Sequence, residues 1–184
     1  VAWHFLLYMI CEFLEFSPVV AQWLNWPRAR RILEGLSTGA VIFGITLSTL
    51  HQSGLGALFL LAPSKIHPLW YSGNIPVLFF VSSIFAGLSM VIFEGSITHR
   101  VFHHRLSPKL IRSDDAIVMG LAKIAGATMF VYLFLEVLKF LHGRLWLVFS
   151  GGWAAWYLVE VLGFVALPMV LLLRGSMAHR PVMV

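Results

Sequence analysis

Residues 47–71 read LSTLHQSGLGALFLLAPSKIHPLWY and separate two long apolar runs of the chain. This stretch gathers histidine, lysine and tryptophan side chains around the apolar patch 57–62, and Gly54 and Gly56 loosen its backbone. Irregular backbone at membrane depth is tolerated only where protein or a watery cavity surrounds it. We therefore expect a partly re-entrant loop that joins two membrane helices and forms one wall of a site.

The composition is that of an integral membrane protein. The chain has 184 residues, of which 59% are hydrophobic and 11% are charged, and its mean hydropathy is +0.87. Soluble domains carry about 25% charged residues, so a soluble fold is excluded. The net charge of +5 could indicate nucleic-acid binding, but its distribution along the chain indicates membrane topology instead. A single cysteine, Cys11, excludes an internal disulfide.

Long apolar runs predict an all-α integral membrane fold. Each run reaches about 20 residues, which is enough to cross a bilayer as a helix. The predicted helices are 1–24, 32–50, 76–97, 116–141 and 145–173. We expect one transmembrane helical bundle over residues 1–184. We expect this bundle to be incomplete, because Val1 already lies inside an apolar run.

The distribution of basic residues predicts the orientation. An odd number of spans places the two ends of the chain on opposite sides. One side carries nine basic residues: Arg28, Arg30, Arg31, Arg100, Arg105, Lys109, Arg112, Arg174 and Arg180. The other side carries three: Lys65, Lys139 and Arg144. Because cytoplasmic loops are enriched in Lys and Arg, the first side is predicted to be cytoplasmic, and the 51–75 loop and the N-terminus face outward.

Besides Glu34, which follows the basic turn at the very start of the span 32–50, five of the eight acidic residues fall inside predicted spans. They are Glu12, Glu15, Glu94, Glu136 and Glu160. A carboxylate at mid-membrane costs at least a few kcal/mol unless it faces a cavity, has a partner or is protonated. One such residue can be a protonated acid that bonds a neighbouring helix. Five together favour a proton or quinone path.

His51, with Gln52 and Ser53 beside it, is a candidate quinone ligand. Histidine can donate a hydrogen bond to a carbonyl oxygen and then deliver a proton, and a quinone that is being reduced needs both. The alternative is that His51 caps the last carbonyls of its helix. His67 and Trp70 are weaker candidates, since HPLW also fits an interfacial turn.

Several other polar residues have simpler explanations. Lys65 either neutralises charge on a reduced quinone or binds a lipid headgroup. The cluster His99, His103 and His104 is interpreted as a solvated face, and no metal site is predicted because no carboxylate or cysteine completes a ligand set. Haem is not favoured. A pair among His4, His51 and His142 is conceivable, but none has a second histidine two turns away on its own helix.

Four motifs together identify a resemblance. They are LEFSP at 14–18, HQSGLG at 51–56, KIHPLW at 65–70 and VIFEG at 91–95. In this order and spacing they resemble the HybB-like branch of the NrfD/PsrC family, the quinone-reacting membrane subunits of hydrogenase-type and related iron–sulfur or molybdopterin oxidoreductases. The resemblance covers residues 1–100 well, and beyond them it depends on Glu136 and Glu160.

The resemblance implies a function. A subunit of this kind binds menaquinone or ubiquinone near the outer face of a bacterial or archaeal cytoplasmic membrane. An iron–sulfur subunit brings electrons from a catalytic subunit, such as a nickel–iron hydrogenase. His51, Glu15 and Glu94 match motif positions and are expected to transfer protons, whereas Glu12 departs from the pattern. Family members are longer, so this chain resembles an internal portion.

Two other functions remain open from the sequence. The chain could be a structural anchor without a redox role, which makes it a non-catalytic subunit. It could also be an ion or proton translocator that uses the series Glu15, Glu94, Glu136 and Glu160. Nucleic acid is not an expected partner, whereas membrane lipid is.

Overall fold

The computed structural model describes residues 2–102 and 108–177, and it is 88% helical. Five helical segments are long and apolar enough to cross a membrane, as predicted. The first four are α1 (Ala2–Trp23), α2 (Pro27–Phe59), α3 (Ile75–Phe102) and α4 (Pro108–His142). The fifth runs without interruption through α5 (Gly151–Leu158), the π-helical segment η4 (Val159–Ala166) and α6 (Leu167–Met177). We call this fifth segment the last span.

The predicted start of the re-entrant loop is wrong, because His51 and the residues after it continue α2 as far as Phe59. A helix satisfies its own backbone groups, which is the least costly arrangement in a bilayer. Gly56 costs about 1 kcal/mol of helix propensity relative to alanine. It also lets α3 approach closely, since a Cβ built there would lie 3.0 Å from Pro76 Cα.

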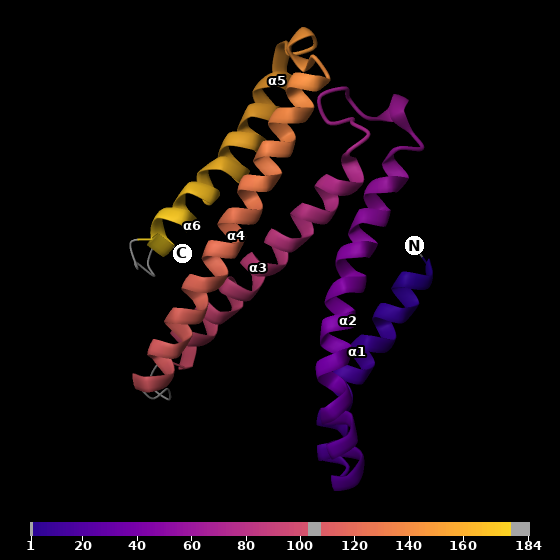
Figure 1. Ribbon diagram of the computed structural model, residues 1–184, viewed down its shortest axis with the longest axis vertical. Coiled ribbons are helices and arrows are strands. Elements are labelled where there is room, and N and C mark those ends of the chain that lie inside the picture. Colours follow the sequence, from indigo (N-terminus) through magenta and orange to yellow (C-terminus); the bar gives the residue numbers. More distant parts are fainter. Residues whose placement is uncertain (1, 103–107, 178–184) are drawn as a thin grey trace.

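The connection between α2 and α3 is therefore short, covering residues 60–74. It contains one 3-10 turn, Pro63–Lys65, and it lies beside the connection between α4 and α5 in Figure 1. Leu69 fixes it there, because this side chain is fully buried against Leu145 and Tyr157. The connection lies at the end of the bundle, and the predicted re-entry is not observed.

The polar 99–115 segment is also more helical than predicted. Its first residues end α3, and residues 108–115 begin α4. His103 and His104 lie outside the described residues, as does Arg180 of the basic tail. The last span begins at Gly151 rather than at 145, because Leu145–Leu147 forms a separate 3-10 turn after Arg144 adopts a left-handed φ of 50°.

The helices pack mainly as sequence neighbours (Figure 1). The pair α1 and α2 is held by a small cluster of Cys11, Ala40 and Leu47. In turn α2 packs against α3, α3 against α4, and α4 against the last span. Large apolar side chains cover much of the outside; Trp3 is 78% exposed and Phe13 is 70% exposed. A surface of this kind is stable in lipid and not in water.

Candidate functional site

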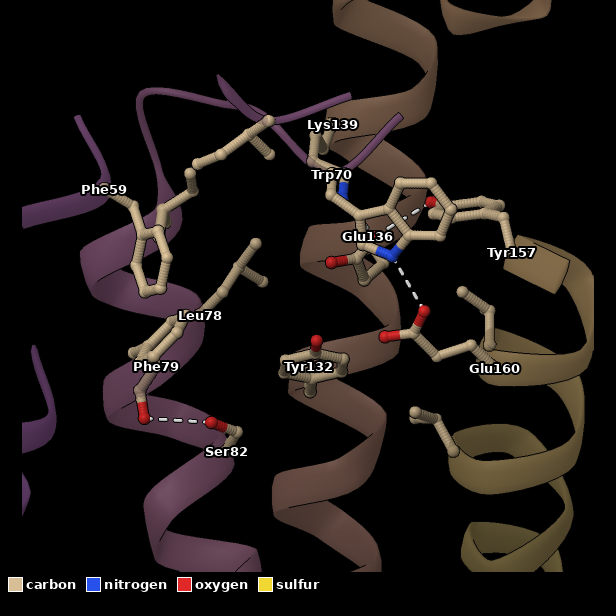
Figure 2. Close-up of a pocket in the computed structure, with 14 residues that line it drawn as sticks. Phe59, Trp70, Leu78, Phe79, Ser82, Tyr132, Glu136, Lys139, Tyr157 and Glu160 are labelled. Carbon is tan, nitrogen blue, oxygen red and sulfur yellow. Dashed lines mark hydrogen bonds and ion pairs between the residues drawn. The ribbon is translucent and has the colours of Figure 1, made fainter. Parts of the chain in front are cut away.

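A cavity of about 240 Å³ lies between the end of α2, the 60–74 connection, α3, α4 and the last span (Figure 2). Most of its wall is apolar, with Phe59, Leu78, Phe79 and Val165 among the lining side chains. Its polar lining residues are Trp70, Ser82, Tyr132, Glu136, Lys139, Tyr157 and Glu160. Small-molecule sites usually have this character, with apolar walls and a few convergent polar groups.

A buried ion pair forms one part of the cavity wall. Lys139 Nζ lies 2.6 Å from Glu136 Oε2, and the two side chains are only 5% and 6% exposed. The hydroxyl of Tyr157 donates a hydrogen bond of 2.8 Å to the same oxygen. One turn of α4 places Glu136 and Lys139 on the same face, three residues apart. An ammonium group has three donors, so Lys139 can hold Glu136 and also bind a carbonyl oxygen in the cavity.

A second hydrogen bond connects the 60–74 connection to the last span. Trp70 Nε1 donates to Glu160 Oε2 at 2.7 Å, although the two residues are 90 positions apart. The Trp70 ring also packs edge-on against Tyr157, with ring centroids 5.8 Å apart. The indole therefore fixes the carboxylate of Glu160 at the cavity. This carboxylate lies beside the hydrogen-bonded pair of Tyr157 and Glu136.

The ring of His67 packs against the ring of Trp70. Its ring lies 5.7 Å from the Trp70 ring and 5.8 Å from the ring of Trp153 at the start of the last span. Its Nδ1 accepts a hydrogen bond of 3.3 Å from the Leu69 backbone N–H, so this nitrogen carries no proton. His67 is thus placed to hold the turn, and it does not line the cavity.

A second cavity, of about 450 Å³, lies between α1, α2 and α3. Glu12 and Glu15 line it, together with the hydroxyl groups of Ser48, Thr49 and Ser83. The two cavities lie on different faces of α3, because Ser82 lines the first and Ser83 the second.

The structure separates the predicted site residues. Trp70, Glu136 and Glu160 meet at the first cavity, and Glu12 and Glu15 meet at the second. Lys65 and Glu94 are exposed and line neither cavity, and Gln52 and Ser53 are half-buried on α2.

His51 does not cap its helix, because α2 continues for two further turns. Its ring lies 6.0 Å from that of Phe5 on α1. Its Nδ1 is buried, with no hydrogen-bond partner in the part of the chain that the structure describes. The structure does not bring His51 to either cavity.

Sequence reasoning missed Lys139, which was assigned to the outward surface on its position near a helix end. The side chain is buried instead. The signal was available, since a glutamate three residues before a lysine in an otherwise apolar helix indicates a pair on one face. Tyr132 and Tyr157 were also missed, because a tyrosine in an apolar run has no distinguishing pattern.

These features define a class of protein: a multi-pass helical membrane protein with a buried ion pair beside an apolar cavity. The chain matches the family described as "Polysulphide reductase, NrfD" over residues 1–184, and it belongs to this NrfD family. Subunits of this family belong to membrane oxidoreductase complexes and react with quinones in general.

Two curated relatives are similar to this chain. A protein of Nitratidesulfovibrio vulgaris is 46% identical over 173 residues, which are 94% of this chain and 45% of that protein. The probable Ni/Fe-hydrogenase 2 b-type cytochrome subunit of Escherichia coli is 36% identical over 85 residues, 46% of this chain and 22% of that subunit. This chain therefore spans less than half of each relative it matches. No solved structure matches it significantly.

Proposed function

We propose that this protein is a quinone-reacting membrane subunit of an oxidoreductase complex, and that the quinone headgroup binds in the first cavity. The observation that carries the proposal is the buried ammonium of Lys139 at the wall of an apolar cavity. A quinone has an apolar ring and two carbonyl oxygens, and negative charge develops on these oxygens as electrons arrive. A fixed cation in a site of low polarity stabilises that charge strongly.

The reaction takes two electrons and two protons per quinone and gives one quinol. The electrons come from an iron–sulfur subunit that docks on the outward side, and the catalytic subunit is a hydrogenase or a related enzyme. Lys139 orients the carbonyl oxygen with its remaining donors, and Tyr157 holds Glu136 in place through its hydrogen bond. Glu160, held by Trp70, exchanges protons with the reduced oxygen. The membrane is the cytoplasmic membrane, with the 60–74 connection outward and the C-terminus cytoplasmic.

Glu160→Gln tests this function. The amide keeps the shape and can still accept the Trp70 hydrogen bond, but it cannot exchange a proton at neutral pH. We expect kcat/KM for quinone reduction by the assembled complex to fall about a hundredfold, within the range that general acid–base catalysis contributes. The control is Glu34→Gln, which removes an exposed pair with Arg30 of little energetic worth.

Assembly is measured in parallel by co-purification of the partner subunits. If Glu160→Gln assembles and turns over normally, the cavity is not the quinone site, and a purely structural anchor becomes the better explanation. His51→Ala is read in the same assay, because His51 remains a sequence-based candidate. If His51→Ala assembles but no longer reduces quinone, the quinone would bind near His51 on α2 instead of in the first cavity.

A visible difference spectrum tests whether haem takes part. We expect no b-type band in the reduced-minus-oxidised spectrum that depends on this subunit, because electrons pass from iron–sulfur cluster to quinone directly. The measurement compares the purified complex with and without the subunit. A band that follows the subunit would make His4, His51 and His142 ligand candidates and would contradict the direct transfer.

A further inference from the structure

A third cavity lies at the turn between α1 and α2, at the other end of α2 from the first cavity (Figure 1). Its volume is about 370 Å³. Its lining residues come from the end of α1, the turn and the start of α2, and they are Ala21, Gln22, Asn25, Trp26, Pro27 and Arg30. Since α2 has 33 residues, the turn lies roughly 50 Å from the 60–74 connection. This cavity is therefore separate from the site proposed for quinone.

The sequence of the turn explains how the cavity forms. The chain reverses abruptly, because α1 ends at Trp23 and α2 begins at Pro27. Asn25 allows this reversal with a positive φ of 54°, a conformation that asparagine adopts more readily than most residues. Proline suits the start of α2, where its missing N–H costs no hydrogen bond. The short turn leaves polar side chains around one open hollow.

These side chains are hydrogen-bond donors that the described part of the chain does not use. The amides of Gln22 and Asn25 and the indole N–H of Trp26 have no hydrogen-bond partner there. Arg30 uses only its Nε, which lies 2.6 Å from Oε1 of Glu34. A guanidinium also has two terminal NH₂ groups, and both remain available to a ligand.

Positive charge surrounds these donors. Residues 25–34 carry three arginines and one glutamate, which is a net charge of +2. Arg28 and Arg31 are exposed next to the cavity without lining it. Convergent N–H donors and positive charge match an oxyanion, and the planar guanidinium of arginine suits phosphate in particular.

Apolar side chains at the same turn indicate that this phosphate belongs to a lipid. Trp23 is 84% exposed and Ile32 is 66% exposed, so both side chains are free to contact lipid. Tryptophan is enriched at the depth of the lipid headgroups. The turn also lies on the side that the basic residues predict to be cytoplasmic. Basic pockets between membrane helices on that side bind the headgroups of anionic lipids.

We propose that the cavity at the α1–α2 turn binds the phosphate of an anionic phospholipid. Arg30 supplies the charge, and Gln22, Asn25 and Trp26 supply further hydrogen bonds to the phosphate oxygens. The acyl chains then lie along the exposed apolar side chains near the turn. This site does not depend on which ligand occupies the first cavity.

Arg30→Gln tests the site. The assembled complex is purified in neutral detergent, stripped of lipid and titrated with phosphatidylglycerol, and native mass spectrometry counts the bound lipid. We expect the dissociation constant to rise at least about tenfold, because the variant loses the charge and the charge-assisted hydrogen bonds of the guanidinium.

Two variants serve as controls. Glu34→Gln breaks the same ion pair but keeps Arg30, so we expect unchanged or tighter lipid binding. Arg174→Gln removes a basic residue from the last turn of α6, outside the cavity. We expect it to change the dissociation constant less than about twofold, because exposed charges beyond a Debye length are largely screened.

The outcomes separate a built site from general attraction. Equal loss in Arg30→Gln and Arg174→Gln, or no loss in Arg30→Gln, would overturn the site. Equal binding of phosphatidylcholine, or displacement of phosphatidylglycerol by an equal concentration of inorganic phosphate, would overturn the lipid as the source of the phosphate. Trp26→Phe keeps the ring and removes the indole N–H. It replaces Arg30→Gln if that variant does not assemble, with an expected loss of about fivefold and the same controls.

Discussion

Lys139→Met is expected to lower quinone reduction a hundredfold or more. Loss of one preorganised donor to a developing oxyanion costs about 100–1,000-fold in rate. The change also leaves the carboxylate of Glu136 buried without its cation. Breaking a buried pair in this way destabilises a protein by about 3–5 kcal/mol. The measurement is quinone reduction per assembled complex, together with the thermal stability of the complex.

A double variant separates the two effects of this change. Glu136→Gln combined with Lys139→Met removes both charges, so no unpaired ion remains and stability should return toward that of the wild type. Quinone reduction should stay low, because the cationic donor is still missing. If activity returns with stability, Lys139 is only structural. Lys123→Met on the exposed part of α4 is the matched control, with activity expected unchanged.

Gly56→Leu is expected to prevent correct assembly of the bundle. A Cβ at this position would lie 2.9 Å from Phe79 Cγ and 3.0 Å from the backbone atom Pro76 Cα. The ring of Phe79 can change its rotamer to avoid the new side chain. The backbone of α3 at Pro76 cannot move without separating from α2. Overpacking of this kind typically costs 1–3 kcal/mol, and a clash with backbone belongs at the upper end. The measurement is the yield of folded subunit from membranes.

Gly39→Leu supplies the control for this effect. Gly39 lies on the same helix, and a Cβ there would meet nothing within 4 Å. If Gly39→Leu gives a normal yield of folded subunit and Gly56→Leu does not, the loss comes from the close contact of Gly56 with α3 and not from a leucine on α2 in general. Normal yield of both would contradict the close approach of α2 and α3 at this point.

Length and apolarity alone decide what can cross a bilayer, so the apolar runs of the sequence were enough to predict a helical membrane fold and the five spans found in the described part of the chain. The sequence also identified Glu136 and Glu160 as membrane carboxylates that need a partner, a cavity or a proton, and Trp70 as a weaker site candidate. The end of α2 could not be read from the pattern. His51 and the glycines suggested irregular backbone, whereas the need to satisfy backbone groups in lipid continues the helix to Phe59.

Which polar residues meet depends on how the helices pack, and the sequence did not reveal it. Trp70 reaches Glu160 across 90 residues of chain because Leu69 is buried against Leu145, in the turn after α4, and Tyr157 of α5. Lys139 becomes a cavity residue because α3 and the last span cover the face of α4 on which it lies. Such pairings depend on the order in which helices pack. Hydrophobic periodicity does not specify that order, because in lipid every side of a membrane helix can be apolar.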